Sequence, residues 1–346
     1  MGHLRIVGIG GGTGLPALLA GLANRPGISL SAIVSVADNG GSSGRLRDGF
    51  GMPAVGDLRN CLVALSHRES ALADLFQHRF SAGGCLEGHS LGNLIVAALY
   101  QRTGSMAQAL EMTSQMLRVE GNALAATEVA PTLCAVLRDG RIIRGESQVS
   151  EAGGAIERIW LEPESPPASR GVLEAIQSAD VIAFAPGSLY TSLLPNFLVD
   201  GVTDAIRESD ATRIMICNIA TQVGETDGFS AAEHLRTVRA HLGDTVIHHC
   251  IVNSPPPRSA EFSLAPGVQF VRYDPRSIAA LGAIPVAAKL LAPPRADGKI
   301  RHDSEKLGSL VVRIAASSRE AAALRPESFA SFTGAPAMCL AQPAVA

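Results

Sequence analysis

The sequence has few charged residues. Asp, Glu, Lys and Arg make up 18% of its 346 residues, against roughly 25% in typical globular proteins. The formal net charge is only −3, which gives no support to a protein that binds nucleic acid or acidic membrane surfaces. We therefore expect neither a nucleic acid nor a membrane among its partners.

Paired cysteines and long apolar runs are also lacking. The six cysteines are scattered and none forms a C-x-x-C motif, which predicts free thiols in a reducing compartment. No set of His, Cys and acidic residues has the spacing of a zinc site, so we expect no metal. No apolar stretch reaches the roughly 18 residues that span a bilayer, and the chain does not open with a signal-peptide pattern. These absences predict a soluble, cytoplasmic protein.

Glycine, by contrast, is abundant. The 35 glycines are about one residue in ten, where roughly 7% is usual. Many backbone positions must therefore adopt unusual dihedral angles or approach a neighbour closely. Apolar residues reach 47%, enough to bury a large core, which excludes wholesale disorder.

Short apolar runs alternate with longer segments of helical period, a pattern typical of an α/β fold. The apolar runs are nearly unbroken, which predicts a mostly parallel sheet with helices on both faces. We expect strands at 5–9, 32–37, 181–185, 213–217 and 246–252, and helices near 171–178, 195–209 and 230–241.

Two insertions interrupt this pattern. Residues 56–117 consist of successive helical segments, and the turn Asp139-Gly140 joins two short strands into an antiparallel hairpin. We expect a single domain over 1–315, with a core at 4–120 and 170–255, a hairpin insertion at about 122–165, a C-terminal segment at 256–315 and a loose Ala/Pro-rich tail at 316–346.

The first expected strand leads into a glycine-rich loop and then an apolar helix. The loop contains Gly11, Gly12, Thr13 and Gly14. Free backbone N–H groups and the helix dipole make such a turn an anion site, and residues 12–17 fit the dinucleotide fingerprint. No G-x-x-x-x-G-K-[ST] motif is present, which disfavours a P-loop ATPase. A purely structural turn is the alternative to phosphate binding by this loop.

The second expected strand ends at Asp38, where a doubly wound fold places an acid against a ribose hydroxyl. A loop of glycines, serines and arginines follows, and such groups suit phosphate or carboxylate oxygens. A flexible turn with solvated arginines is the alternative. If the protein catalyses a reaction, Asp38 is our one candidate catalytic residue. The candidate ligand-binding residues here are Asp38, Asn39, Ser42, Ser43 and Arg45.

Two helix starts and two later strand ends add polar candidates, because ligands of open α/β sheets bind beyond the carboxyl ends of the strands. Asp57 could instead complement a helix N-terminus, His89 could be a structural group, and either later loop could be a plain turn. The candidates are Asp57, Asn60, His89, Asn93, Gly187, Ser188, Tyr190, Thr191, Ser192, Asn218, Thr221 and Gln222.

Several of these segments carry a family resemblance. They are GGGTGL from Gly10, VADNGGSSGRLR from Val36, GDLRN from Gly56, GHSLGNL from Gly88 and PGSLYTSLLPN from Pro186, with ICN and TQVGETDG after them. In this order they resemble the gluconeogenesis factor family (YvcK type), within the superfamily of 2-phospho-L-lactate transferase (CofD type). The chain departs from the family pattern at Asn39, where relatives commonly have aspartate, and at Val223, where they have proline.

The resemblance implies a Rossmann-like fold in a cytoplasmic bacterial protein that binds nucleotide sugars such as UDP-N-acetylglucosamine. It implies a regulator that links carbon metabolism to cell-wall and cell-shape control, with no established reaction. The alternative is a 2-phospho-L-lactate transferase-like enzyme with a nucleotide-activated donor and Mg²⁺. The dinucleotide fingerprint leaves a third class, a nicotinamide-dependent oxidoreductase.

Several expectations about ligand and partners follow. The ligand would be a UDP-sugar, with NAD or GDP as other candidates, and no further cofactor is required. A cell-wall or metabolic enzyme and a second copy of the chain are the expected protein partners. Arg301 would close over a bound diphosphate, unless it is a surface residue paired with Asp303.

Overall fold

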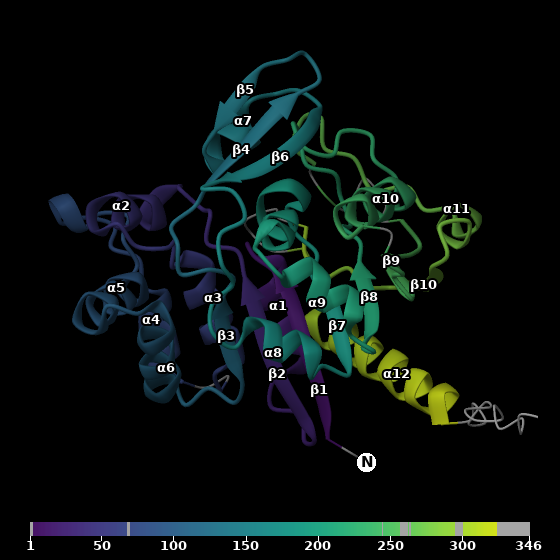
Figure 1. Cartoon of the computed structure of the whole chain (residues 1–346), viewed down its shortest axis with the longest axis horizontal. Helices are drawn as coiled ribbons and strands as arrows, with labels where there is room; N and C mark the ends of the chain where they lie inside the picture. The colour runs from purple at the N-terminus through teal and green to yellow at the C-terminus, as the bar shows by residue number, and fades with distance from the viewer. Residues whose placement is uncertain are drawn as a thin grey trace, which may run out of the picture.

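A seven-stranded parallel sheet forms the centre of the molecule, with strands in the order β10-β9-β8-β7-β1-β2-β3. The computed structural model describes residues 3–67, 70–243, 245–256, 262, 264–294 and 300–323. Figure 1 shows the helices on both faces, so the predicted α/β architecture is confirmed. The strands are β1 (Leu4–Gly10), β2 (Ile28–Val34), β3 (Asn122–Ala125), β7 (Val181–Phe184), β8 (Thr212–Ile216), β9 (His249–Asn253) and β10 (Ile284–Ala288).

Alternate side chains of the strands fill two separate cores. On β1, Ile6 belongs to one core and Val7 and Ile9 to the other, because successive side chains point to opposite faces of a sheet. The core around Ile6 is covered by α1 (Gly14–Leu22), α3 (Gly56–Leu65) and α12 (Ser304–Ala323). The other face is covered by α8 (Val172–Gln177), α9 (Val202–Glu208) and α10 (Ala231–His241).

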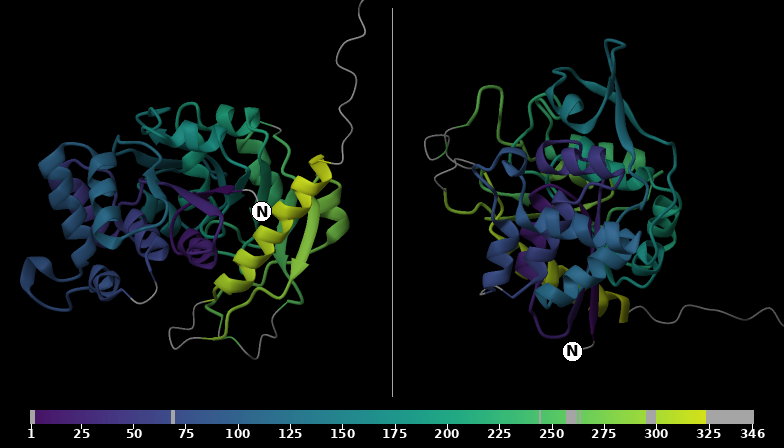
Figure 2. Two further views of the ribbon diagram at one scale, coloured as in Figure 1. Left: turned by 90° about the horizontal axis from the view of Figure 1, so that it is seen from below. Right: turned by 90° about the vertical axis from the view of Figure 1, so that its left-hand side faces the viewer.

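The helical insertion lies at the β3 end of the sheet (Figures 1 and 2). It consists of α2 (Gly41–Phe50), α3, α4 (Ala71–Gln77), a short 3₁₀ turn at Gly84–Leu86, α5 (Leu91–Thr103) and α6 (Met106–Leu117). One expectation was wrong: the serines and arginines after Asp38 are not on a loop, because helix α2 already begins at Gly41. Gly44 permits this helix, since a Cβ there would overlap the carbonyl oxygen of Asn39.

The predicted hairpin is confirmed and has a third strand beside it. The small sheet has the order β5-β4-β6, and it projects from the edge at which the main strands end (Figure 1). Its strands are β4 (Thr132–Leu137), β5 (Ile142–Arg144) and β6 (Ile156–Glu162), and α7 (Glu146–Glu151) follows β5. The expected start of this insertion at 122 was too early, because β3 pairs with β2 in the main sheet and buries Ala123 and Ala125 there.

Other boundaries also differ from those expected. The helix expected at 195–209 is broken into a 3₁₀ turn (Leu194–Leu198) and α9, and Gly201 between them adopts a φ of 75°. A π turn (Leu189–Leu193) precedes the 3₁₀ turn. Strand β2 ends at Val34 rather than at 37, and β9 begins at His249 rather than at 246. α11 (Pro275–Ala279) precedes β10.

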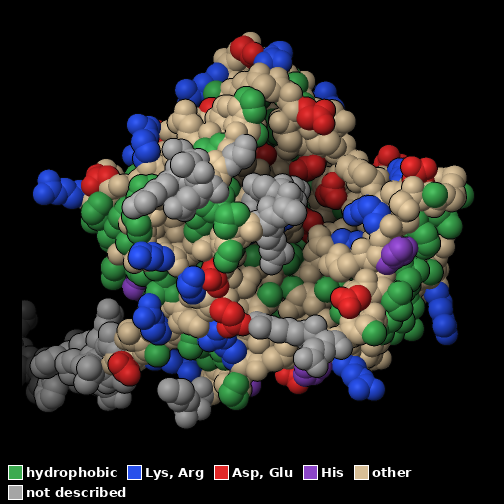
Figure 3. All heavy atoms as spheres, turned by 180° about the vertical axis from the view of Figure 1, so that it is seen from behind, with side chains coloured by type: hydrophobic (Ala, Val, Ile, Leu, Met, Phe, Trp, Pro, Cys, Tyr) green, Lys and Arg blue, Asp and Glu red, His purple; other side chains and the backbone are tan. Residues whose placement is uncertain are grey.

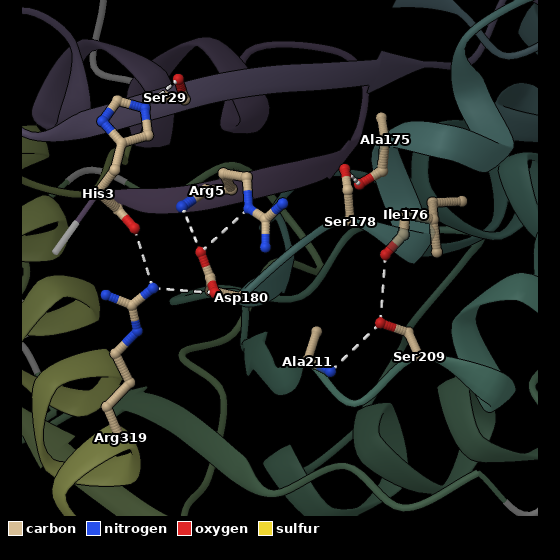
Figure 4. Close-up of polar contacts among 10 residues, drawn as sticks. All are labelled: His3, Arg5, Ser29, Ala175, Ile176, Ser178, Asp180, Ser209, Ala211 and Arg319. Carbon is tan, nitrogen blue, oxygen red and sulfur yellow. Dashed lines mark hydrogen bonds and ion pairs between the residues drawn. The ribbon is translucent and has the colours of Figure 1, made fainter.

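The C-terminal helix α12 is part of the fold and extends past residue 315, where we expected a loose tail. Its stripe of Leu307, Val311 and Ile314 is buried in the core, and residues 324–346 lie outside the described residues. Near its end, Arg319 donates to Asp180 at 2.9 Å and to the carbonyl of His3 at 3.0 Å (Figure 4).

Among the described residues, no helix has the length and apolar character that a membrane span requires.

Helix α12 crosses α1 at two buried glycines, Gly21 and Gly308. A Cβ at Gly308 would overlap the backbone of Gly21, and a Cβ at Gly21 would overlap that of Ser304. The two helices therefore approach more closely than any larger residue allows.

We predict that Gly308→Ala destabilises the protein by about 1–3 kcal/mol, the usual cost of overpacking a close contact. Urea unfolding measures this change. The matched control is Gly49→Ala, because Gly49 is an exposed helical glycine with nothing near its would-be Cβ. This control is expected to be neutral or stabilising by up to ~1 kcal/mol. Equal effects of the two substitutions would contradict the close crossing.

Candidate functional site

A cleft of about 830 Å³ opens beyond the carboxyl ends of β1, β7 and β8. Its walls are the loops that follow these strands, together with α7 of the small sheet and the segment 300–302. Figure 3 shows this hollow below the small sheet, with acidic side chains on its wall and basic ones beside them. Open parallel sheets bind ligands at this edge, and the volume lies in the usual range for small-molecule sites.

The structure brings about half of the predicted site residues together around this cleft. They come from the three strand ends and from the C-terminal segment, and their part in binding stays a prediction. The predicted residues that line the cleft are Gly12, Thr13, Gly14, Gly187, Ser188, Thr191, Ser192, Asn218, Thr221, Gln222 and Arg301.

The glycine loop after β1 packs tightly against the loop after β7. A Cβ at Gly14 would overlap the carbonyl oxygen of Pro186, so only glycine allows this approach. The exposed N-cap residue Thr13 makes no side-chain cap bond to α1. The helix N-terminus therefore borders the cleft without a capping side chain, as an anion site requires.

Not all of the loop's N–H groups are available to a ligand. The N–H of Gly12, which has a φ of 59°, donates to Oδ2 of Asp57 at 2.5 Å. Gly11 is buried below the cleft, and a Cβ there would meet Asp57 and Ser192. Asp57 therefore acts on the loop itself, beyond the helix-capping role that we considered.

Burial raises the pKa of Asp57 to about 6, and the nearby carboxylate of Asp38 adds to this effect. The N–H of Gly12 and the charge of Arg59 act in the opposite direction. Oδ1 of Asp38 accepts from the N–H of Gly40 at 2.8 Å. Asp38, which follows β2, and Asp57, in the first turn of α3, thus place two carboxyl groups near each other, and Asp57 contacts the glycine loop.

A second group of predicted residues lies away from the cleft lining, between α2 and α5. Oγ of Ser42 accepts from Nδ2 of Asn93 at 3.0 Å and lies 2.9 Å from Nδ1 of His89. Burial lowers the pKa of His89, and the charge of Arg45 lowers it further. The imidazole is therefore neutral at pH 7, and we interpret this buried cluster as a support for α2.

The remaining predicted residues have partners within the protein. Oδ1 of Asn39 accepts from the backbone N–H and the hydroxyl of Ser147 at 2.9 and 2.6 Å. Oδ1 of Asn60 accepts from Arg59 at 2.6 Å, and Arg45 donates to the carbonyl of Glu87 at 2.6 Å. Tyr190 is buried in the core and bonds to Thr237, and Ser43 packs below Gly56.

The sequence-based prediction missed four polar residues of the cleft: Glu146, Ser150, Glu225 and His302. Oε2 of Glu225 accepts from Ser188 at 2.5 Å, and its Oε1 lies 3.4 Å from Oγ of Ser150. Burial raises the pKa of Glu146 to about 7, although a hydrogen bond to Thr191 opposes this. Glu225 lies inside the quoted TQVGETDG segment and His302 directly follows the candidate Arg301, whereas the sequence around Glu146 gives no indication of a function.

The residues present do not form a strong metal site. In the described ranges, no group of three or more His, Cys, Asp or Glu side chains could hold a metal ion. At the end of β2, Asn39 stands beside Asp38 and its amide oxygen is engaged by Ser147. A Mg²⁺ ion held by two adjacent carboxylates therefore does not fit this strand end.

Comparison with known proteins identifies the family. Residues 6–291 match the family model described as 2-phospho-L-lactate transferase CofD. The chain is 48% identical over 251 residues to the gluconeogenesis factor of Halalkalibacterium halodurans, covering 72% of this chain and 78% of that protein. It is 41% identical over 313 residues to the gluconeogenesis factor of Bacillus subtilis, covering 90% of this chain and 98% of that protein. The chain belongs to the gluconeogenesis factor family, within the CofD superfamily.

A solved structure supports the same assignment. A crystal structure of a member of the UPF0052 family from Bacillus halodurans superposes with a TM-score of 0.84 and 41% sequence identity. The match covers 90% of this chain and all of that one, 100%. The Rossmann-like fold expected from the resemblance is thus confirmed.

The raised pKa of Asp57 predicts a pH-dependent cost to stability. The pKa rises from 3.8 to about 6 on folding, so the folded state loses stability as the pH rises through this window, and the loss is complete above it. Asp57→Asn removes the cost and should stabilise the protein more at pH 8 than at pH 5, by roughly 1–1.5 kcal/mol. Urea unfolding at the two pH values measures the difference.

The control is Asp139→Asn in the exposed hairpin turn, where hydrogen bonds from Arg141 lower the pKa of the carboxyl. Its effect on stability should have the opposite sign. A pH-independent effect of Asp57→Asn would contradict the burial of an ionisable carboxyl below the glycine loop.

Proposed function

We propose that this protein is a cytoplasmic, nucleotide-sugar-binding regulator that links carbon metabolism to cell-wall and cell-shape control. Its ligand would be UDP-N-acetylglucosamine or a similar UDP-sugar, held in the cleft beyond β1, β7 and β8. The observation that carries the proposal is the uncapped N-terminus of α1 at the floor of this cleft. Backbone N–H groups and the helix dipole at such a site favour a phosphate.

The other cleft residues suit the rest of such a ligand. Arg301 can supply charge-assisted hydrogen bonds to phosphate oxygens. The amides of Asn218 and Gln222 and the hydroxyl of Thr221 also line the cleft and can form hydrogen bonds to a base or a ribose. Asn218 is itself held by two bonds to the backbone of Gly187, at 2.8 and 2.7 Å, which fixes its orientation.

A transferase is the second candidate, because the CofD family model covers most of the chain. Such an enzyme would use Asp38 and Mg²⁺ at the end of β2. The engagement of Asn39 by Ser147 and the bond between Asp38 and Gly40 leave one carboxylate there for a metal. This donor set supports the regulator over the transferase.

Arg301 provides a direct test of the proposed ligand. We expect Arg301→Ala to weaken binding of UDP-N-acetylglucosamine at least tenfold, because one charge-assisted hydrogen-bond partner contributes roughly 1.5–3 kcal/mol. Arg301→Lys should recover only part of this loss, since a lysine cannot make bidentate contacts. Isothermal titration calorimetry measures the affinity, and the melting temperature of the unliganded protein should stay nearly unchanged.

The matched control is Arg313→Ala, an exposed arginine on α12 that does not line the cleft. It should bind the UDP-sugar as the wild type does. Unaltered affinity in Arg301→Ala would remove Arg301 from the site, and absence of binding by the wild type would overturn the proposed function.

A further inference from the structure

The cleft contains several hydrogen-bond acceptors. A diphosphate is itself an acceptor and cannot donate to them. Glu146 comes from α7 of the small sheet, and Glu225 comes from the loop after β8. Their bonds are to hydroxyl groups and to one backbone N–H: Glu146 bonds to Thr191, and Glu225 bonds to Ser188, Ser150 and the N–H of Tyr190. Within the described part of the chain, the ion pairs involve neither carboxyl group.

A third acceptor in the same cleft is buried and has no partner. His302 is 9% exposed and lines the cleft. One ring nitrogen bonds to the backbone of Cys217, while Nε2 is buried without a hydrogen bond. Burial lowers the pKa of this histidine to about 4, so the ring is neutral. With Nδ1–H donating to Cys217, Nε2 is a lone-pair acceptor that requires a donor.

These acceptors determine which chemical group can lie beside them. A buried acceptor without a donor is costly, and a phosphate or carboxylate next to Glu146 and Glu225 in their ionised forms would be repelled by like charge. A neutral group with several O–H or N–H donors satisfies all three acceptors. A hexose, or an N-acetylhexosamine with its amide N–H, is such a group.

We infer that Glu146, Glu225 and His302 form the sugar subsite of the cleft and select a neutral, hydroxyl-bearing sugar. The diphosphate lies instead at the N-terminus of α1 and at Arg301. This inference rests on the proposed function. It adds the orientation of the ligand in the cleft and the requirement that its sugar be uncharged. Because Glu146 belongs to the small sheet, that insertion supplies sugar specificity to the Rossmann-like core.

The test compares ligands that differ only at the sugar. Calorimetry at pH 7.5 would use UDP-glucose, UDP and UDP-glucuronate, which carries a carboxylate on the sugar. For the wild type we expect UDP-glucose to bind at least tenfold more tightly than either of the other two. In Glu146→Ala the advantage of UDP-glucose over UDP should fall severalfold, with UDP affinity unchanged or increased.

Glu225→Gln is the second variant, and it keeps the test decisive if Glu146→Ala does not fold. It retains the size of the side chain and removes its charge, so affinity for UDP-glucuronate should rise toward that for UDP-glucose. The matched control is Glu151→Ala, an exposed glutamate on the same helix α7, which should preserve all ratios.

The outcomes separate the two proposals. Equal wild-type affinity for the three ligands would overturn the sugar subsite and leave nucleotide binding in place. Wild-type ratios retained in both Glu146→Ala and Glu225→Gln would also overturn it. Failure of the wild type to bind any of the three ligands would overturn the proposed function, and the subsite with it.

Discussion

The contact between Gly14 and the carbonyl of Pro186 positions both walls of the cleft. It brings the first turn of α1 against the loop after β7, and no side chain fits between them. The hydrogen bond from Gly12 to Asp57 then fixes the loop from the other side. These two contacts fix the N-terminus of α1 relative to the loop after β7 and to α3 of the helical insertion.

Two contacts between the small sheet and the core complete the cleft. Asn39 binds the start of α7 through Ser147, and Ser150 reaches Glu225 on the loop after β8. These bonds hold α7 against the core loops, and Glu146 and Glu225 line the cleft that the N-terminus of α1 also borders. The cleft therefore combines the helix N-terminus, which we propose for the diphosphate, with acceptors that we propose for the hydroxyl groups of the sugar.

The parts of the site that follow from local rules could be predicted from sequence. A parallel sheet brings its strand ends to one edge, so the loops at Gly12, Ser188 and Asn218 were expected to meet, and they do. Arg301 joins them although its segment is distant in the sequence. The glycine loop was correctly placed between a strand and a helix because its apolar flanks and glycines agree on that structure.

Tertiary contacts account for what could not be predicted. The burial of Ser42, His89 and Asn93 depends on the packing of α2 against α5, which no spacing reveals. Helix α2 itself forms in a segment of glycines and serines whose local preference is for a loop. Glu146 reaches the cleft only through the fold of the small sheet, so its sequence context carries no sign of function.

Hydrogen exchange measured by mass spectrometry, with and without saturating UDP-N-acetylglucosamine, tests the location of the ligand most directly. Our account predicts protection of backbone amides at 12–15, 187–192, 218–222 and 300–302. The groove of about 430 Å³ between α6 and β3 should show no change. Protection confined to that groove, or to the region around His89 between α2 and α5, would contradict the placement of the ligand beyond β1, β7 and β8.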